Sequence, residues 1–204
     1  MSAASSEIVV VDYGMGNLRN VGRAFERAGA RPRVTTDPDE ILRSDRLVVP
    51  GVGALGDAMG ALEKLGLVGP LRERIQDGRP YLGICVGLQV LLDEGEEGPA
   101  RCLGLIPGKV SRFPETSELP VPHMGWNAVK PLEAHPLLEQ GYFYFVHSYR
   151  PCQVPRDQVL ATTDYGEVFP SAVGFDACVA VQFHPEKSQR AGLALLERFC
   201  SWSP

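Results

Sequence analysis

Through residues 7–93 the sequence alternates short apolar runs with stretches whose apolar residues recur at helical spacing. The apolar runs are EIVVVDYG at 7–14, RPRVTT at 31–36, DRLVVPGVG at 45–53 and YLGI at 81–84. Helical patterns follow at 18–28, 37–44, 57–64, 68–76 and 86–93. Apolar strands joined through helices are typical of a parallel sheet that is covered on both faces.

The second half of the chain is rich in short β-prone segments separated by prolines and glycines. These segments are KVSRF, GWNAV, YFYFVHSY, QVLATTDY and VAVQF, and residues 188–201 predict a closing amphipathic helix. The proline-rich stretch at 113–122 is expected to be an ordered surface loop rather than a domain boundary. Because 204 residues with 44% hydrophobic content can bury a full core, we predict one α/β domain over 1–204 with a mixed sheet.

Composition narrows the possible partners and the compartment. A net charge of −5 without clustered Lys and Arg argues against nucleic-acid and anionic-membrane surfaces. The N-terminal MSAASSE lacks the regions of a signal peptide, and no apolar stretch approaches the ~20 residues that span a bilayer, so a cytoplasmic protein is expected. Five cysteines without a C-x-x-C pair argue against disulfides and a metal site.

Cys85 lies between Gly83 and Gly87 in the segment GICVGLQ, where the apolar run YLGI gives way to a helical pattern. This arrangement resembles the G-x-S-x-G nucleophile elbow, with sulfur in place of oxygen. The two glycines lack side chains that would clash across a tight strand-to-helix turn. A helix N-terminus also favours a thiolate through its unpaired N–H groups. The alternative is a buried cysteine that acts as a small hydrophobe.

A thiolate that attacks a carbonyl carbon needs a proton carrier, and His184 is the candidate. His184 follows the apolar run ACVAVQF, and Pro185 prevents the strand from continuing. Glu186 lies two positions further on, and in an extended backbone such residues face the same side about 7 Å apart. We therefore predict that Glu186 accepts the Nδ1 proton of His184 and leaves Nε2 towards Cys85, as in a catalytic triad.

Acyl transfer also needs N–H donors for the negative charge that develops on the substrate oxygen. The N–H of Val86 is one candidate, and the N–H of Val52 in the glycine-rich turn PGVG at 50–53 is the other. That turn lacks the Lys-Ser/Thr ending of a phosphate-binding P-loop. GMG at 14–16 suggests a dinucleotide site, but Arg19 occupies the third glycine position, so no cofactor is expected.

Taken together, GICVGLQ, PGVG and FHPE resemble the class I glutamine amidotransferases, in the family's order and spacing from residue 8 to about residue 199. Further segments are similar to the glutaminase subunits of imidazole glycerol phosphate synthases within that family, namely VDYGMGNLRNV, EEG, PHMGWN, YFVHSY and FHPEKS. The resemblance implies a flavodoxin-like α/β fold with a mixed, mostly parallel central sheet and helices on both faces.

The resemblance also implies hydrolysis of glutamine to glutamate and ammonia. Cys85 would attack the side-chain amide carbon, His184 would protonate the departing ammonia and then activate water, and Glu186 would hold His184. Substrate-binding positions would be Gly53, Gln89, Glu97, His147, Ser148 and Tyr149. Of these, Glu97 would read the α-amino group, and Gly53 with the HSY segment would line the carboxylate end.

A further implication is a heterodimer with a cyclase subunit, a (β/α)8 barrel that receives the ammonia through an internal channel. The expected docking residues are Asn17, Arg19, Trp126, Asn127 and Lys187. Other interpretations stay open from the residues: a glutaminase that serves another acceptor, a stand-alone cysteine hydrolase, or a catalytically silent binding subunit. The glycines beside Val52 also predict a peptide free to turn its N–H towards or away from the oxyanion, and so an activity that depends on the partner.

Overall fold

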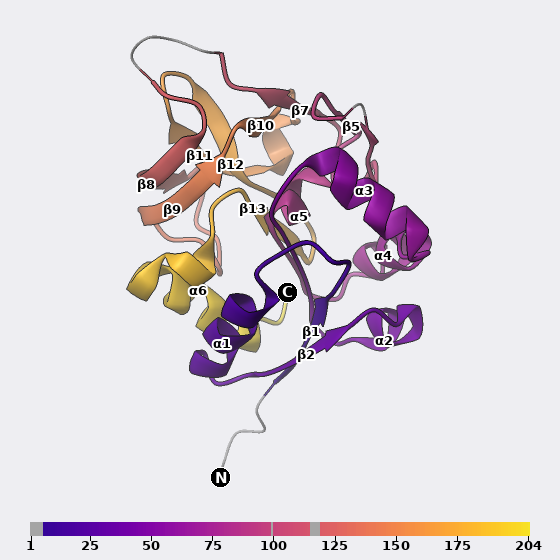
Figure 1. The fold of residues 1–204 in the computed structure, drawn as a ribbon. Helices are drawn as coiled ribbons and strands as arrows, with labels where there is room; N and C mark the ends of the chain where they lie inside the picture. Colours follow the sequence, from indigo (N-terminus) through magenta and orange to yellow (C-terminus); the bar gives the residue numbers. More distant parts are fainter. Residues whose placement is uncertain (1–5, 99, 115–118) are drawn as a thin grey trace.

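A computed structural model describes residues 6–98, 100–114 and 119–204, and its centre is a nine-stranded mixed sheet (Figure 1). The strand order is β2-β1-β3-β4-β13-β12-β11-β8-β9. The strands are β1 Glu7–Val11, β2 Arg31–Thr35, β3 Leu47–Gly51, β4 Tyr81–Cys85, β8 His123–Pro131, β9 Gly141–His147, β11 Val159–Asp164, β12 Val168–Phe175 and β13 Cys178–Val181.

The sheet changes character at β13. Strands β2, β1, β3, β4 and β13 are parallel, whereas β12, β11, β8 and β9 continue the sheet in antiparallel fashion. Strands β3 and β4 are completely buried, as expected for apolar strands covered on both faces. The prediction of a mixed sheet with a parallel first half is confirmed.

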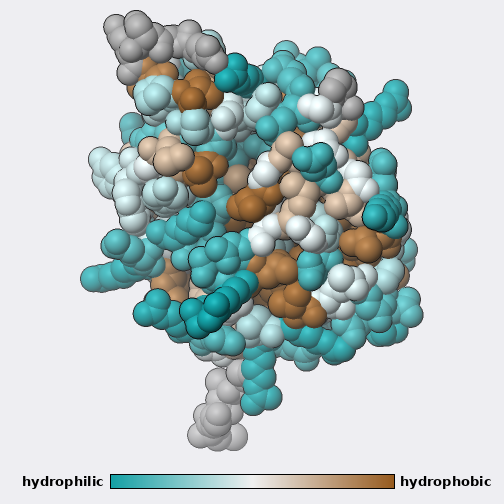
Figure 2. Space-filling model, in the orientation of Figure 1, coloured by the Kyte–Doolittle hydropathy of each residue, from teal (hydrophilic) through white to brown (hydrophobic). Residues whose placement is uncertain are grey.

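Helices cover both faces of the parallel half. Helix α1 packs against α6 on one face, and α2 packs against α4 beside α3 on the other (Figure 1). The helices are α1 Leu18–Arg27, α2 Pro38–Arg43, α3 Leu55–Lys64, α4 Val68–Gln76, α5 Val86–Gln89 and α6 Gln189–Ser201, with short 3-10 helices η1 Arg156–Gln158 and η2 Pro185–Lys187. Figure 2 shows mainly hydrophilic side chains on the outer faces of α1 and α6.

A second, four-stranded sheet was not expected from the sequence. It consists of β10 Tyr149–Cys152, β7 Lys109–Arg112, β5 Glu94–Gly95 and β6 Ala100–Arg101, in that order. This sheet follows the nucleophile segment in the chain and carries Tyr149 at one end. Among the described residues, no helix is both long and apolar enough to cross a membrane. All five cysteines are free thiols.

One local expectation is wrong, and one strand was missed. The helix predicted over 86–93 ends at Gln89, because the carbonyls of Val90, Leu91 and Leu92 accept hydrogen bonds from the backbone at 103–106 instead of continuing the helix. Strand β12 was not predicted, although it is central to the antiparallel half. Of the loop expected at 113–122, residues 115–118 lie outside the described part of the chain.

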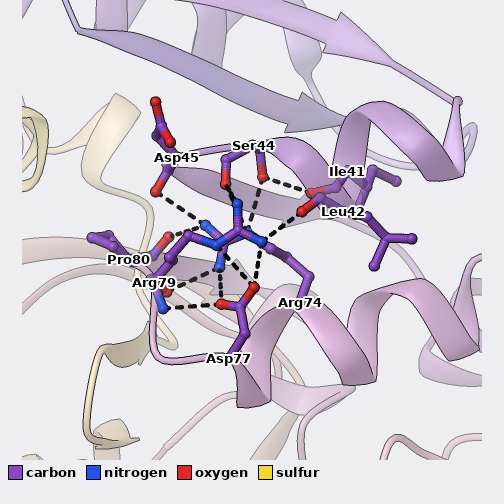
Figure 3. Close-up of polar contacts among 8 residues, drawn as sticks. All are labelled: Ile41, Leu42, Ser44, Asp45, Arg74, Asp77, Arg79 and Pro80. Atoms are coloured by element: carbon purple, nitrogen blue, oxygen red, sulfur yellow. Dashed lines mark hydrogen bonds and ion pairs between the residues drawn. The ribbon is translucent and has the colours of Figure 1, made fainter.

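The amino-terminal edge of the sheet is held by a buried guanidinium. Arg74 on α4 is fully buried and donates to the carbonyl oxygens of Ser44, Asp45, Arg79 and Pro80 (Figure 3). Burial, together with the charge of the neighbouring Arg79, lowers the pKa of Arg74 to about 10. Since Pro80 precedes β4, this cluster lies at the opposite end of that strand from Cys85.

Candidate active site

Cys85 is the last residue of β4 and precedes α5 with a left-handed backbone, φ 55°. A Cβ at Gly83 would lie 2.4 Å from the carbonyl oxygen of Gly87, and one at Gly87 would lie 1.8 Å from that of Val49. No side chain fits at either position, so the predicted steric reason for both glycines is confirmed. A non-glycine residue at positive φ is uncommon and typical of a strained functional turn.

His184 and Glu186 form a buried pair beside this elbow. Nδ1 of His184 lies 2.8 Å from Oε1 of Glu186, and both side chains are only 2% exposed. The sequence argument assumed an extended backbone between them, but Pro185–Lys187 forms the 3-10 helix η2. The tight turn brings the two groups within hydrogen-bond distance, and Ser188 Oγ fixes it by donating to the carbonyl of His184 at 2.6 Å.

The electrostatics of His184 connect it to the thiol. Burial by itself lowers the pKa of His184, but the sulfur of Cys85 and the carboxylate of Glu186 outweigh it and raise the pKa to about 10. Nε2 of His184 has no hydrogen-bond partner among the described residues. A protonated imidazole whose Nε2 makes no hydrogen bond within the described part of the chain can protonate a leaving group.

A pocket of about 520 Å³ opens over Cys85. Its lining includes ten residues singled out in the sequence as oxyanion, substrate or docking positions: Val52, Gly53, Val86, Gln89, Glu97, His147, Ser148, Tyr149, Asn17 and Lys187. These residues come from segments between positions 17 and 187 of the chain. The fold therefore brings the predicted substrate residues together with the nucleophile.

The turn after β3 packs directly against the elbow. Gly51 is the register partner of Cys85, and a Cβ there would lie 2.6 Å from the Cβ of Val86. Gly53 has φ +100°, which favours glycine. The hydroxyl of Tyr13 donates to the carbonyl of Pro50 at 2.8 Å and fixes the start of the turn. Sequence reasoning missed Tyr13, which in VDYG looked like the end of a strand.

Glu97 lies at the amino end of α3. Its Oε2 accepts from the backbone N–H of Leu55 at 3.0 Å, and its carbonyl accepts from Gly56 at 3.1 Å. A carboxylate at a helix N-terminus is stabilised by the unpaired N–H groups there. Glu97 therefore presents a fixed negative charge on the pocket wall, which suits an ammonium group.

Gln182 is a buried polar residue of the site that sequence reasoning also missed. Its Nε2 lies 3.5 Å from Sγ of Cys85, and its Oε1 accepts from Nε2 of Gln89 at 3.2 Å. The only signal in the sequence was a glutamine inside the apolar run VAVQF. Gln89, predicted as a substrate contact, uses its amide N–H groups on Gln182 and on the carbonyl of Tyr149.

A model of the glutamine amidotransferase class-I family matches residues 9–201, and this range contains the elbow, the PGVG turn and the His-Glu pair. The chain belongs to the class I glutamine amidotransferase family. The resemblance read from the sequence is thereby confirmed.

Curated relatives of this amidotransferase carry a common name. The chain is 48% identical over 202 residues to imidazole glycerol phosphate synthase subunit HisH of Salinibacter ruber, and the match covers 94% of this chain and 93% of that protein. It is 50% identical over 196 residues to the protein of the same name from Methanothermobacter thermautotrophicus, covering 94% and 96%. The match thus extends over nearly the whole of each chain.

Solved structures share the fold of this amidotransferase. PurLQS from Thermotoga maritima superposes with a TM-score of 0.76 at 17% identity, covering 97% of this chain and 99% of that one. A structure described as glutamine amidotransferase superposes with a TM-score of 0.73 at 22% identity, covering 94% and 98%. The expected class I amidotransferase fold is confirmed.

The expected docking residues of the amidotransferase lie at the pocket, on α1 and on β8. Asn17 and Lys187 are at the pocket, where Asn17 also caps α1 by accepting from the N–H of Asn20. Arg19 is exposed on the first turn of α1. Trp126 is exposed on β8.

Asn127 differs from the other docking positions because its amide is directed into the protein. Its Nδ2 donates to the carbonyl of Asp164 at 2.9 Å and contacts Nε2 of His123 at 3.2 Å. Its Oδ1 accepts from the N–H of Ala128. The amide of Asn127 is therefore hydrogen-bonded to groups of its own chain.

Proposed function

We propose that this amidotransferase is the glutaminase subunit of an imidazole glycerol phosphate synthase. It hydrolyses L-glutamine to L-glutamate and ammonia, which a cyclase subunit uses to make imidazole glycerol phosphate and aminoimidazole carboxamide ribotide in histidine biosynthesis. The observation that carries the proposal is a thiol on the wall of a pocket with a buried His-Glu pair beside that thiol, in a chain about half identical to proteins named as that subunit. We place this activity in the cytoplasm, and we treat residues 1–204 as one domain.

The geometry supports acylation through Cys85. The thiolate adds to the side-chain amide carbon of glutamine, and the N–H groups of Val52 and Val86 stabilise the resulting oxyanion. His184 gives its Nε2 proton to the amide nitrogen, which leaves as ammonia and breaks the C–N bond. The products of this half reaction are a γ-glutamyl thioester on Cys85 and a neutral imidazole on His184.

Water then completes the cycle by hydrolysing the thioester. The neutral imidazole of His184 takes a proton from water as its oxygen adds to the thioester carbon, and the C–S bond then breaks to release glutamate and the thiolate. Glu186 keeps Nδ1 protonated and orients the ring in both half reactions. The carboxylate of Glu97 holds the α-ammonium group, and Gly53 with residues 147–149 lines the carboxylate end.

The hairpin of β8 and β9 supports the proposed cyclase interface. Met124 and Trp126 are 61% and 47% exposed on one face of β8, and Tyr142 is 65% exposed on the same face of β9. An exposed aromatic and methionine-containing face is typical of a protein interface. β9 also reaches the catalytic turn, since the carbonyl of Tyr144 accepts from the N–H of His184.

Glutamate formation from glutamine, with and without a purified cyclase subunit, tests the proposal. We expect a heterodimer on gel filtration, glutamate formation that rises when the cyclase binds, and loss of activity in Cys85→Ala. Glutaminase activity without complex formation would point to another acceptor synthase. Turnover of other amides or esters with no preference for glutamine would indicate a general cysteine hydrolase, and complex formation without turnover would indicate a silent binding subunit.

A further inference from the structure

A chain of buried polar groups reaches the nucleophile through Gln182. It runs from Cys85 through Gln182 and Gln89 to the carbonyl of Tyr149, and the imidazole of His147 joins the same carbonyl at 2.8 Å. Gln182 has no exposed surface. We call these groups the buried polar chain. The reaction steps described above give Gln182 no role.

The histidine end of the chain has a defined direction. A carbonyl oxygen only accepts, so Nδ1 of His147 carries the proton that faces Tyr149. Burial lowers the pKa of His147 to about 3 and that of His123 to about 4, so both rings are neutral near pH 7. Nε2 of His147 therefore accepts, and Nδ1 of His123, 3.0 Å away, donates to it. Nε2 of His123 then accepts from Asn127.

The glutamine end has a defined direction as well. The amide nitrogen of Gln89 donates both to the carbonyl of Tyr149 and to Oε1 of Gln182, each at 3.2 Å. With its oxygen committed, Gln182 can offer only its NH₂ group to the sulfur of Cys85. A reversed amide would set two NH₂ groups against each other and an oxygen against the sulfur, so the observed orientation is strongly favoured.

We propose that Gln182 is a positioning residue that donates an N–H to the sulfur of Cys85 and stabilises its thiolate, with Gln89 and the Tyr149 carbonyl fixing the donor's direction. The proposal rests on the thiolate mechanism under the proposed function. Gln182 and His184 are two residues apart in the segment after β13, so one short segment supplies both the neutral donor and the cationic partner of the sulfur.

A neutral donor suits both half reactions. It favours the thiolate before attack and again when the C–S bond of the thioester breaks, because the hydrogen bond is strongest when the sulfur carries negative charge. Unlike a second cation, the amide has no proton to transfer, so it does not compete with His184 for protonation of the leaving nitrogen.

The test is the pH dependence of iodoacetamide alkylation at Cys85, followed by mass spectrometry of peptides from the full-length protein. Gln182→Met removes the donor at similar volume, and Gln182→Glu places a carboxylate oxygen against the sulfur. We expect alkylation at pH 7 to slow roughly threefold in the first and roughly tenfold or more in the second, with the midpoint of the profile moved to higher pH. The kcat for glutamine should fall in both variants along with the alkylation rate.

Two controls separate a positioning role from simple loss of packing. Ser171→Ala changes a buried side chain next to the backbone of Gln182 without touching the buried polar chain, so its profile should match the wild type. The half-buried Cys152 reports general reagent access within each variant. A folded Gln182→Met protein with an unchanged midpoint, rate and kcat would overturn the proposal, and if Gln182→Glu does not fold, Gln182→Met alone decides.

Failure here and failure of the proposed function are distinguishable. If Cys85→Ala abolishes glutaminase activity but Gln182 variants alkylate normally, the function stands and the role of Gln182 falls. If the wild type with its cyclase hydrolyses no glutamine, the function falls, while the alkylation profile still reports on Gln182.

Discussion

Gly51 and Cys85 are register partners at the carboxyl ends of β3 and β4, and this pairing joins the PGVG turn to the nucleophile elbow. A Cβ at Gly51 would lie 2.4 Å from the hydroxyl of Tyr13 and 2.6 Å from the Cβ of Val86. Any side chain at position 51 must therefore push the turn and the elbow apart, and with them both proposed oxyanion donors.

Gly51→Ala is expected to lower kcat for glutamine at least roughly tenfold while costing about 1–3 kcal/mol of unfolding free energy. Steady-state kinetics and denaturant unfolding measure the two effects. The matched control is Gly60→Ala on α3, where no atom lies within 4 Å of the added Cβ, and this change should leave kcat unaltered and stabilise by about 0.5–1 kcal/mol. Equal kcat in the two variants would contradict the proposed oxyanion geometry.

Glu186→Gln keeps the shape of the His184 partner but removes its charge. We expect kcat to fall roughly 100-fold or more, because Nδ1 protonation and the imidazolium both lose support. Since Glu186 raises the pKa of His184, the alkaline limb of the kcat profile should also move to lower pH. Kinetics from pH 5 to 10 provide the measurement, and Glu197→Gln at an exposed position on α6 is the control. A shift of the alkaline limb to higher pH in Glu186→Gln would be inconsistent with the His184–Glu186 pair.

His123 and His147 should make the fold less stable in mild acid. Their pKa values fall from 6.5 to about 4 and about 3 in the folded protein, so the unfolded chain binds more protons below pH 6.5. Their contribution is complete above pH 6.5 and is lost as pH falls towards 3–4, by at most about 1.4 kcal/mol per group per pH unit. The pH dependence of stability that His184 contributes has the opposite sign. The pKa of His184 is raised, so its stabilising contribution is lost only as pH rises towards about 10.

Urea unfolding at pH 7.0, 6.0 and 5.0 measures this acid dependence. The double variant His123→Asn with His147→Gln should have a flatter dependence than the wild type. Nitrogen NMR of the imidazoles should find both rings neutral at pH 6 with the proton on Nδ1. A proton on Nε2 of His147 would refute the direction assigned to the buried polar chain.

Arg74→Met should destabilise the protein by about 3 kcal/mol, because four carbonyl oxygens around its guanidinium lose their donor (Figure 3). The cluster lies at the far end of β4 from Cys85, so kcat of the folded protein should stay within about twofold. Arg72→Ala, an exposed neighbour on α4, should change stability by less than about 0.5 kcal/mol. Similar unfolding midpoints for the two variants would count against this role of Arg74.

Trp126→Ala should weaken binding of the cyclase subunit roughly tenfold or more, as expected for an exposed aromatic anchor of an interface. Titration calorimetry against the purified cyclase measures the change. Val168→Ala, which removes an exposed apolar side chain from β12, serves as control and should bind like the wild type. If the two variants bind alike, the face formed by β8 and β9 is not the interface.

Sequence alone was sufficient for features that depend on local pattern. The strands and helices of the first half follow from apolar runs and helical spacing, and Cys85 with its two glycines predicted an elbow that the backbone bears out. His184 and Glu186 could be paired because they are two residues apart, although the pairing uses a 3-10 turn rather than an extended segment. Local sequence restricts backbone conformation strongly, so such features can be read directly.

Tertiary structure decided the features that depend on contacts far apart in the chain. The helix after Cys85 stops at Gln89 because carbonyls at 90–92 bond to residues 103–106, which no local periodicity reveals. Gln182 gained its place beside Cys85 from a separation of 97 residues, and its direction from Gln89, 93 residues away. A glutamine next to a strand end has no preferred partner until the sheet is assembled, because only burial forces each of its polar atoms to find one.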